Sequence, residues 1–337
     1  MKQTITLVYR GQEVEASLYE GCRLIETVLV EETGAAECAE NIVSGFSSAA
    51  DVTRVISPGG CLKPLMAGCY KITPTALADA VQNRYGLHRY NHLMEICWEA
   101  AGRYQAVSYL ADAMSVDELS SLNRISSHEK VKKYSRGYAL EHRAAMELEG
   151  RIENRRPEDS NYIAVHADDF VSIGAYESGR CLDINDGIGS EGPMGFTASG
   201  DVPCAQMASY FGSSSLSYRE MQELLLKKSG VFQYLGTECP HKLDTLAAEN
   251  SDADLIVRTM AYQTAKWVGS SAVVLNGKVD GILISGRGVH SEALMRYLLP
   301  RIEKIAPVHI LKELELSKYL AGKAELISTG MCPVREY

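Results

Sequence analysis

The sequence predicts an α/β protein of two domains, in which a unit of three strands occurs twice. Three observations support this. Residues 18–23 (LYEGCR) and 175–180 (AYESGR) align without gaps, with Tyr19 and Tyr176 standing 157 positions apart. Each copy is followed by longer segments of helical period. The chain of 337 residues is also about twice as long as a typical single domain.

The repeated unit consists of a strand, a short turn, a second strand, a turn at Glu-Gly or Ser-Gly, and a third strand. The match extends backwards, because Val8 falls on Val165 and Tyr9 falls on His166. We therefore expect antiparallel three-stranded sets near residues 4–30 and 161–187, each in its own domain. The alternative is that two unrelated hairpins share a YExxR string.

The domain boundary is expected in the polar stretch 153–160, just before the second repeat begins. It gives an N-terminal domain of residues 1–158 and a C-terminal domain of residues 159–337, with a cleft between them. In the first half, a strand at 54–56 leads into loop-rich sequence, which indicates an insertion at about 58–100.

In the second half, residues 252–275 place Leu255, Met260 and Val268 near one helical stripe, and residues 279–284 read as a buried strand. Glycines at 286 and 288 follow that strand immediately. A strand, a glycine turn and a helix start form a place where backbone N–H groups can meet a phosphate or a nucleotide. Any α/β crossover also needs such a turn, so the signal is unspecific alone.

Composition excludes several classes of protein. Lys and Arg number 34 and Asp and Glu 43, which gives a net charge of -9 and argues against binding to nucleic acid or to anionic membranes. The 46% hydrophobic content excludes wholesale disorder. The nine cysteines contain no CxxC pair and predict neither a disulfide framework nor a zinc knuckle. We therefore expect a cytoplasmic protein.

A series of strings, in order and at matching spacing, resembles butyrate kinase. The strings run from the first strand to about Leu311: Gly59-Gly60, Lys63-Pro64, Gly68-Cys69-Tyr70, Arg84-Tyr85-Gly86-Leu87-His88, Val116-Asp117-Glu118, Asp183-Ile184-Asn185-Asp186, Glu191-Gly192-Pro193, Ser199-Gly200, Tyr234-Leu235-Gly236-Thr237, Met260-Ala261-Tyr262-Gln263 and Ala265-Lys266.

This resemblance implies two duplicated ribonuclease-H-like domains of the acetate and sugar kinase/Hsp70/actin fold, with an acyl-site insertion in the first domain. It also implies ATP and Mg²⁺ as cofactors, a homodimer or larger assembly, and phosphoryl transfer from ATP to a short-chain carboxylate. The site residues that it implies are catalytic Asp117 and Glu118, cofactor-binding His166, Asp168, Asp169, Gly286, Arg287 and Gly288, and substrate-binding Gly59, Gly60 and Tyr138. The metal ligands stay unknown.

The departures from the family pattern lie where phosphate is handled. The first hairpin turn reads YRGQEVE at 9–15, where the family carries Asn-Pro-Gly-Ser-Thr-Ser-Thr-Lys. The second reads HADDF at 166–170, where His-Leu-Gly-Gly-Gly is expected. Pro58 and Ala198 stand where the family has arginines, and Tyr138 where it has a histidine.

These replacements remove positive charge and add negative charge. A carboxylate about 4 Å from a phosphate oxygen is repelled by roughly 4 kcal/mol at an effective dielectric of about 20. Asp168 and Asp169 both fall at that turn, and Phe170 replaces a glycine that would permit close approach of a ligand. A Mg²⁺ ion between carboxylate and phosphate would reverse the sign of the interaction.

Two functional hypotheses follow. The first is a butyrate-kinase-type enzyme, a phosphotransferase with a carboxyl group as acceptor, whose activity is weak or lost. The second is a non-catalytic subunit that binds a small carboxylate or an acyl phosphate, or that pairs with an active kinase. The residues also permit structural readings: His166 as a packed histidine, and Asp117-Glu118 as the start of a helix.

Overall fold

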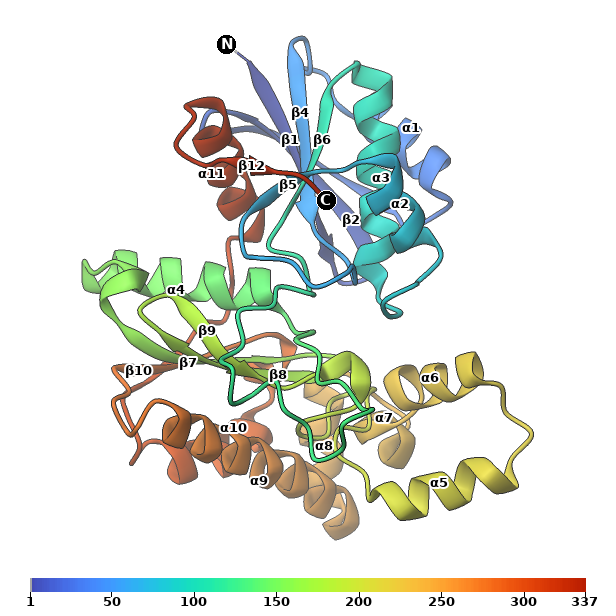
Figure 1. Ribbon diagram of the computed structural model, residues 1–337, viewed down its shortest axis with the longest axis vertical. Coiled ribbons are helices and arrows are strands. Elements are labelled where there is room, and N and C mark those ends of the chain that lie inside the picture. The colour runs from blue at the N-terminus through green and yellow to red at the C-terminus, as the bar shows by residue number, and fades with distance from the viewer. Residues whose placement is uncertain (1) are drawn as a thin grey trace. The chain divides into compact units, whose positions relative to one another are not determined.

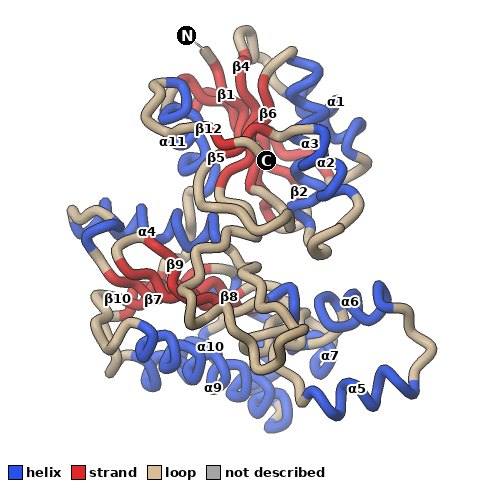
Figure 2. Tube along the Cα trace, in the orientation of Figure 1, coloured by secondary structure: helices blue, strands red, loops and turns tan. Residues whose placement is uncertain are grey.

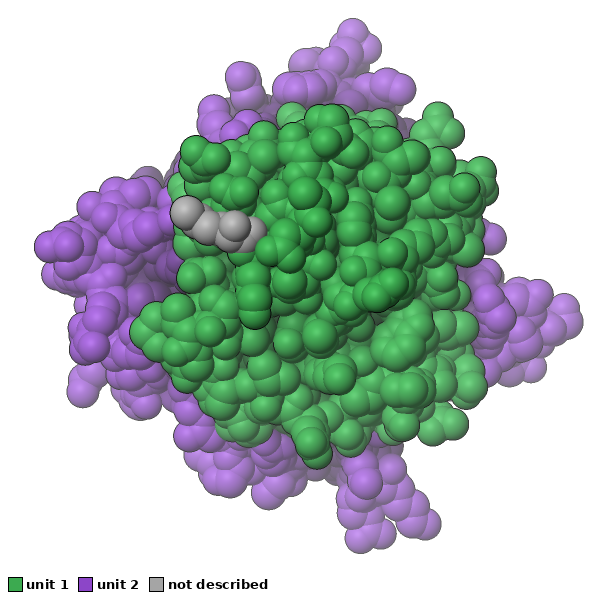
Figure 3. All heavy atoms as spheres, turned by 90° about the horizontal axis from the view of Figure 1, so that it is seen from above, with its two compact units in different colours: residues 1–117, 315–337 green, residues 118–314 purple. Residues whose placement is uncertain are grey.

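The computed structural model describes residues 2–337, which form two compact units. Among the described residues, one unit comprises residues 2–117 with 315–337, and the other comprises residues 118–314 (Figure 3). Within the described residues, no helix combines the length and the apolar character that crossing a membrane requires.

The first unit is built on a seven-stranded sheet in the order β12-β5-β6-β4-β1-β2-β3 (Figures 1 and 2). Its strands are β1 (Gln3–Arg10), β2 (Glu13–Glu20), β3 (Arg23–Glu31), β4 (Val52–Pro58), β5 (Cys69–Lys71), β6 (Val107–Ala111) and β12 (Val334–Arg335). Its helices are α1 (Ala35–Gly45), α2 (Pro74–Val81), α3 (Arg89–Tyr104) and α11 (Leu316–Ser328). The helices α1 to α3 pack together on one side of the sheet, and α11 packs on β1 and β4 from the other (Figure 1).

The second unit is built on a five-stranded sheet in the order β11-β10-β7-β8-β9. Its strands are β7 (Asn161–Ala167), β8 (Val171–Glu177), β9 (Arg180–Ile184), β10 (Gly281–Ser285) and β11 (Val308–Ile310). Its helices are α4 (Ala139–Glu153), α5 (Cys204–Ser213), α6 (Tyr218–Lys227), α7 (Gly230–Leu235), α8 (Pro240–Glu249), α9 (Ser251–Val274) and α10 (Glu292–Ile302).

Side-chain alternation along the second sheet separates two cores. Ile163 and Val165 of β7 belong to the apolar cluster that α9 and α10 cover. Tyr162 and Ala164, which point to the opposite face, belong to a second cluster beneath α4. Successive residues of a strand face opposite sides of a sheet, so one strand supplies both cores.

The predicted duplication is confirmed at the level of strands and registers. In each unit the three repeat strands are antiparallel, the first of them pairs in parallel with a later strand, and the order of those strands matches. Each second-to-third strand ladder also contains a register shift at the same repeat position, between Leu18 and Tyr19 and between Ala175 and Tyr176. An irregularity repeated at an equivalent place favours a common origin over two unrelated hairpins.

The compact units divide the chain at points other than the expected boundary between residues 158 and 159. Helix α4, which precedes that boundary, packs on β7 and β10 of the second sheet, and the C-terminal α11 packs on the first sheet. A polar stretch marks a position along the chain. A compact unit is instead defined by packing, in which each helix belongs with the sheet that buries its apolar face.

The long helix in the second half is present as α9, but its buried stripe is displaced from the predicted one. Leu255, expected to face the core, is 54% exposed, whereas Val257 is buried together with Met260 and Val268. The stripe begins at Ala253 and continues at helical spacing, so Leu255 falls on the opposite face.

Candidate functional site

The parallel pairing of β7 with β10 brings two turns of the second unit together. His166 lies opposite Ser285 in this ladder, and its Nδ1 is 3.0 Å from the Ser285 Oγ. The carboxyl ends of parallel strands meet at one edge of a sheet, so the turn at 168–170 and the loop at 286–290 are neighbours. The structure thus groups the residues that the resemblance assigned to the cofactor.

Glycine is needed at two positions of the second loop. Gly286 has a φ of 88°, and a Cβ there would lie 2.6 Å from the carbonyl oxygen of Ala167. A Cβ at Gly288 would lie 2.7 Å from the Ala167 Cβ. Both glycines therefore allow the loop to approach the end of β7 closely. This close packing by itself explains why glycine stands at both positions.

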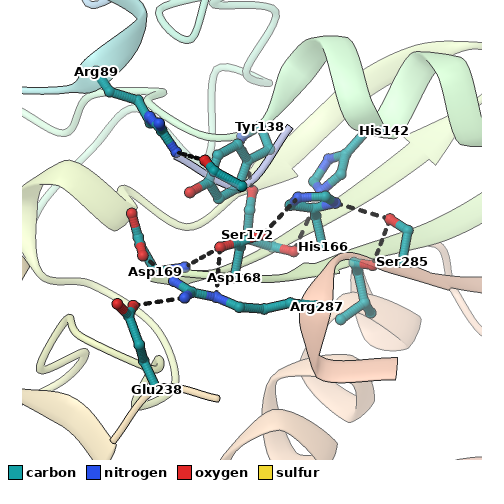
Figure 4. Close-up of polar contacts among 12 residues, drawn as sticks. Arg89, Tyr138, His142, His166, Asp168, Asp169, Ser172, Glu238, Ser285 and Arg287 are labelled. Carbon is teal, nitrogen blue, oxygen red and sulfur yellow. Dashed lines mark hydrogen bonds and ion pairs between the residues drawn. The ribbon is translucent and has the colours of Figure 1, made fainter. Parts of the chain in front are cut away.

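Arg287, between these glycines, is held by three carboxylates (Figure 4). Its Nε lies 2.8 Å from Asp168 Oδ1, its Nη1 donates to Glu238 Oε2 at 2.6 Å, and its Nη2 contacts Asp169 Oδ1. The guanidinium also lies 5.0 Å from the centre of the Phe196 ring. We call Arg287, Asp168, Asp169 and Glu238 the Arg287 cluster.

The Arg287 cluster has more negative than positive charge. Burial alone would lower the pKa of Arg287, but the carboxylates of Asp168, Asp169 and Glu238 outweigh this and raise that pKa above its usual range. One guanidinium therefore stays charged and faces three carboxylates, all of them partly exposed. The cluster as a whole repels a phosphate group.

The turn at 168–170 also uses its own backbone donors. The Asp168 N–H donates to the carbonyl of Phe170 at 3.2 Å, and the Asp169 N–H donates to Asp168 Oδ1 at 2.9 Å. The side chain of Phe170 is buried and stacks on Tyr138, with ring centres 4.3 Å apart. The expected steric obstruction by this side chain is therefore wrong, because it points into the core.

His166 is a packed histidine in this structure. It is 8% exposed, and its ring lies 4.6 Å from that of Tyr138. Burial, with a further effect of the Arg287 charge, lowers the pKa of His166 to about 3. Burial and the neighbouring His166 likewise lower the pKa of His142 to about 3. Both imidazoles are therefore neutral at pH 7.

The glycines assigned to the substrate lie in the first unit, where the amides of residues 59–61 all have internal partners. Gly59 N–H donates to a backbone carbonyl at 3.1 Å, and Gly60 N–H lies 3.1 Å from the sulfur of Met94. Cys61 N–H donates to Asn91 Oδ1 at 2.7 Å. A Cβ at Gly60 would lie 2.2 Å from that same oxygen, so packing against α3 explains the glycine.

Asp117 and Glu118 do not begin a helix, so that structural reading is wrong; the next α-helix begins at Ala139. Glu118 accepts a hydrogen bond from Arg143 at 2.7 Å and one from the Cys181 N–H at 3.1 Å. These contacts join the segment before α4 to α4 itself and to β9. Asp117 is partly exposed, and its N–H donates to the carbonyl of Leu65 at 2.7 Å.

Two residues that bind the turns were missed from the sequence. Glu238 directly follows the recognised Tyr-Leu-Gly-Thr string, and the cation at Arg287, between two glycines, was the signal that a carboxylate partner was needed. Arg89 binds the first hairpin turn: it donates to the Gly11 carbonyl at 2.9 Å, and its guanidinium lies 3.5 Å from the centre of the Tyr9 ring. Each hairpin turn is thus held by an arginine of its own unit.

The cofactor residues do not fit the phosphates of ATP as they stand. In the turn at 168–170, the amides of Asp168 and Asp169 are used internally, and the cation of the neighbouring loop is already paired with carboxylates. Phosphate sites normally offer free backbone amides and unpaired cations.

Residues 122–335 match the acetokinase family. A protein of Enterococcus faecalis named probable butyrate kinase is 31% identical over 273 residues, which cover 80% of this chain and 76% of that protein. A protein of Coprothermobacter proteolyticus with the same name is 30% identical over 308 residues, covering 91% of this chain and 86% of that protein. The chain belongs to the acetokinase family.

Solved structures agree in fold. An acetate kinase from Porphyromonas gingivalis superposes with a TM-score of 0.77 at 16% identity and covers 97% of this chain and 99% of its own. A propionate kinase from Francisella tularensis gives a TM-score of 0.78 at 14% identity, over 96% of this chain and 99% of its own. The acetate and sugar kinase/Hsp70/actin fold expected from the sequence is therefore confirmed for this acetokinase-family chain.

Proposed function

We propose that this chain is an acetokinase-family protein in which ATP-dependent phosphorylation of a short-chain carboxylate is weak or lost. The observation that carries the proposal is the Arg287 cluster. Phosphoryl transfer depends on positive groups and free amides around the phosphoryl oxygens. Here a single cation of the turn region is matched to three carboxylates of the same unit.

The substrate side supports the same proposal. Pro58 and Ala198, which stand in place of family arginines, are buried and bring no charge. Tyr138, in place of a histidine, is 4% exposed and stacks on Phe170. Loss of one transition-state contact commonly costs about a hundred- to a thousandfold in rate. The rate losses from several residues that act on one phosphoryl group cannot be summed. Together they still exceed the rate enhancement that one retained carboxylate supplies.

The lineage still specifies which ligands to test. By resemblance they are ATP with Mg²⁺, and a small carboxylate or acyl phosphate. Asp117 is the proposed catalytic carboxylate, because the resemblance assigns it that role and the residue is partly exposed. Glu118 is better explained as a structural residue, since its carboxylate joins Arg143 to the backbone of β9.

A binding or partner subunit is the second candidate function. No residue of α5 is buried, and Tyr210 of α5 and Tyr218 of α6 are 52% and 71% exposed. These exposed aromatic side chains suit association with another copy or with an active kinase. We further propose a homodimer or larger assembly, which light scattering at micromolar concentration tests, and a cytoplasmic location, which the free thiols of all nine cysteines suit.

A hydroxamate assay with acetate, propionate, butyrate and isobutyrate tests the proposed function. The purified chain is compared with the Enterococcus faecalis relative in the same ATP and Mg²⁺ buffer. We expect turnover at least about a thousandfold below the enzyme median of about 10 per second. Turnover near that median with any of the four acids would refute the proposal.

A further inference from the structure

A second group of ligand-type side chains lies at the edge of the second sheet. Glu149 and Glu153 stand four residues apart on the last turns of α4, and His309 is the middle residue of the edge strand β11. One side-chain donor atom from each lies within 4.8 Å of the other two. Residues at i and i+4 share one face of a helix, so both carboxylates are presented to the imidazole.

The buried carboxylate is the observation that points to a ligand. The Glu149 side chain is 2% exposed, and its Oε1 has no hydrogen-bond partner among the described residues. That oxygen lies 2.8 Å from the Nδ1 of His309, which makes an ion pair with it when the imidazole is protonated. A buried carboxylate without hydrogen bonds is costly unless a positive charge lies beside it.

The distance between these two atoms suits a shared metal ion. Metal–oxygen and metal–nitrogen bonds to such ligands are about 2.0–2.2 Å, so two ligands stand about 3.4 Å apart on a tetrahedral ion and about 3 Å apart at a right angle on an octahedral ion. The 2.8 Å between Glu149 Oε1 and His309 Nδ1 is close to the right-angle spacing.

We propose that Glu149, Glu153 and His309 bind a divalent transition-metal cation. One imidazole and two carboxylates favour Zn²⁺ or Mn²⁺ over Mg²⁺ and Ca²⁺, which prefer oxygen ligands alone. Glu153 is exposed and His309 is 29% exposed, so one side of the site is open to water and to entry of the ion. The proposal does not depend on the proposed function.

The ion would fasten the end of α4 to an otherwise weakly held strand. β11 has three residues and pairs only with β10 among the described strands, so it contributes few ladder hydrogen bonds. Gly281 of β10 leaves room for the imidazole, because a Cβ there would lie 3.3 Å from His309 Cδ2. Metal binding therefore adds a cross-link between a helix and an edge strand.

The test uses the full chain after EDTA treatment and dialysis, titrated with Zn²⁺ and separately with Mn²⁺ by calorimetry. The variants are Glu153→Gln and His309→Gln, with the exposed Glu158→Gln and His241→Gln as matched controls. Glu153 and His309 are partly exposed, so their variants are expected to fold, and thermal unfolding checks this. Zn²⁺ also binds thiols, and Cys22 and Cys204 are exposed, so comparison of variants identifies the site.

We expect binding of one ion per chain, weakened by more than about tenfold in both ligand variants and unchanged in both controls. The thermal midpoint of the wild type should rise with the bound metal and fall back on addition of EDTA. Absence of saturable binding of either ion, or equal affinity in the wild type and the two ligand variants, would overturn the proposal.

Discussion

Replacing both acidic residues of the second hairpin turn by their amides should create nucleotide affinity. The change Asp168→Asn with Asp169→Asn removes two negative charges from the Arg287 cluster. An Asn at 168 keeps an oxygen that can accept from the N–H of residue 169, as Asp168 Oδ1 does at 2.9 Å. Arg287 then retains Glu238 as its one charged partner. The turn is thus preserved while the cluster becomes neutral.

The expected size follows from the exposure of these groups. Two unit charges about 6 Å apart interact by about 3 kcal/mol at an effective dielectric of about 20. Asp168 and Asp169 are 32% and 38% exposed, so solvent reduces each contribution. About 1 kcal/mol each remains, in line with measured partly exposed pairs. The double variant should therefore bind ATP about thirtyfold more tightly than the wild type, at about 1.4 kcal/mol per tenfold.

The assay is titration of each protein with ATP and Mg²⁺, with the exposed Asp159→Asn as the matched control for loss of one negative charge. Equal urea denaturation midpoints would show that the double variant keeps its fold. Unchanged affinity would mean that the turn does not face nucleotide. Weaker affinity would mean that Mg²⁺ bridges the carboxylates to phosphate. Both results contradict the electrostatic account.

Three further results are expected. Phe170→Gly should lower the free energy of unfolding by about 3–5 kcal/mol in urea, because the ring is 3% exposed, and a loss below about 1 kcal/mol would contradict its core position. Gly60→Ala should destabilise by about 1–3 kcal/mol through the clash with Asn91, whereas Gly212→Ala, in open space on α5, should be neutral or stabilising. Because the pKa of His166 is lowered to about 3, the unfolded chain binds the extra proton below about pH 6.5. The contribution of neutral, buried His166 to the free energy of unfolding is therefore complete above that pH and declines as the pH falls toward 3. An NMR titration that shows ionisation of His166 between pH 5 and 8 would contradict this.

The repeated strand unit was predictable from the sequence because period-2 alternation and turn residues are local signals. The offset between Tyr19 and Tyr176 located both copies, and the register shift beside each tyrosine shows that even an irregularity was inherited. The family was predictable for a related reason, since its strings survive in order. The structure agrees with both.

The details that failed depend on contacts between distant segments. Phe170 was expected to face a ligand, but a strand-end residue can turn inward once Tyr138 from another segment offers a ring to stack on. Arg287 was expected to bind the cofactor, and only the structure shows that Asp168, Asp169 and Glu238 all converge on it. Charge pairing across more than a hundred residues leaves no periodic trace in a single sequence.

Calorimetric titration of the wild-type chain with ATP and Mg²⁺ tests the central claim most directly. The claim is that the ion pairs of the Arg287 cluster prevent the turn at 168–170 from binding phosphate. The Enterococcus faecalis relative, titrated in the same buffer, serves as the comparison. The account predicts no saturation below about millimolar ATP, a binding free energy weaker than about 4 kcal/mol. Saturation at low micromolar ATP, with the Arg287 cluster intact, would contradict it.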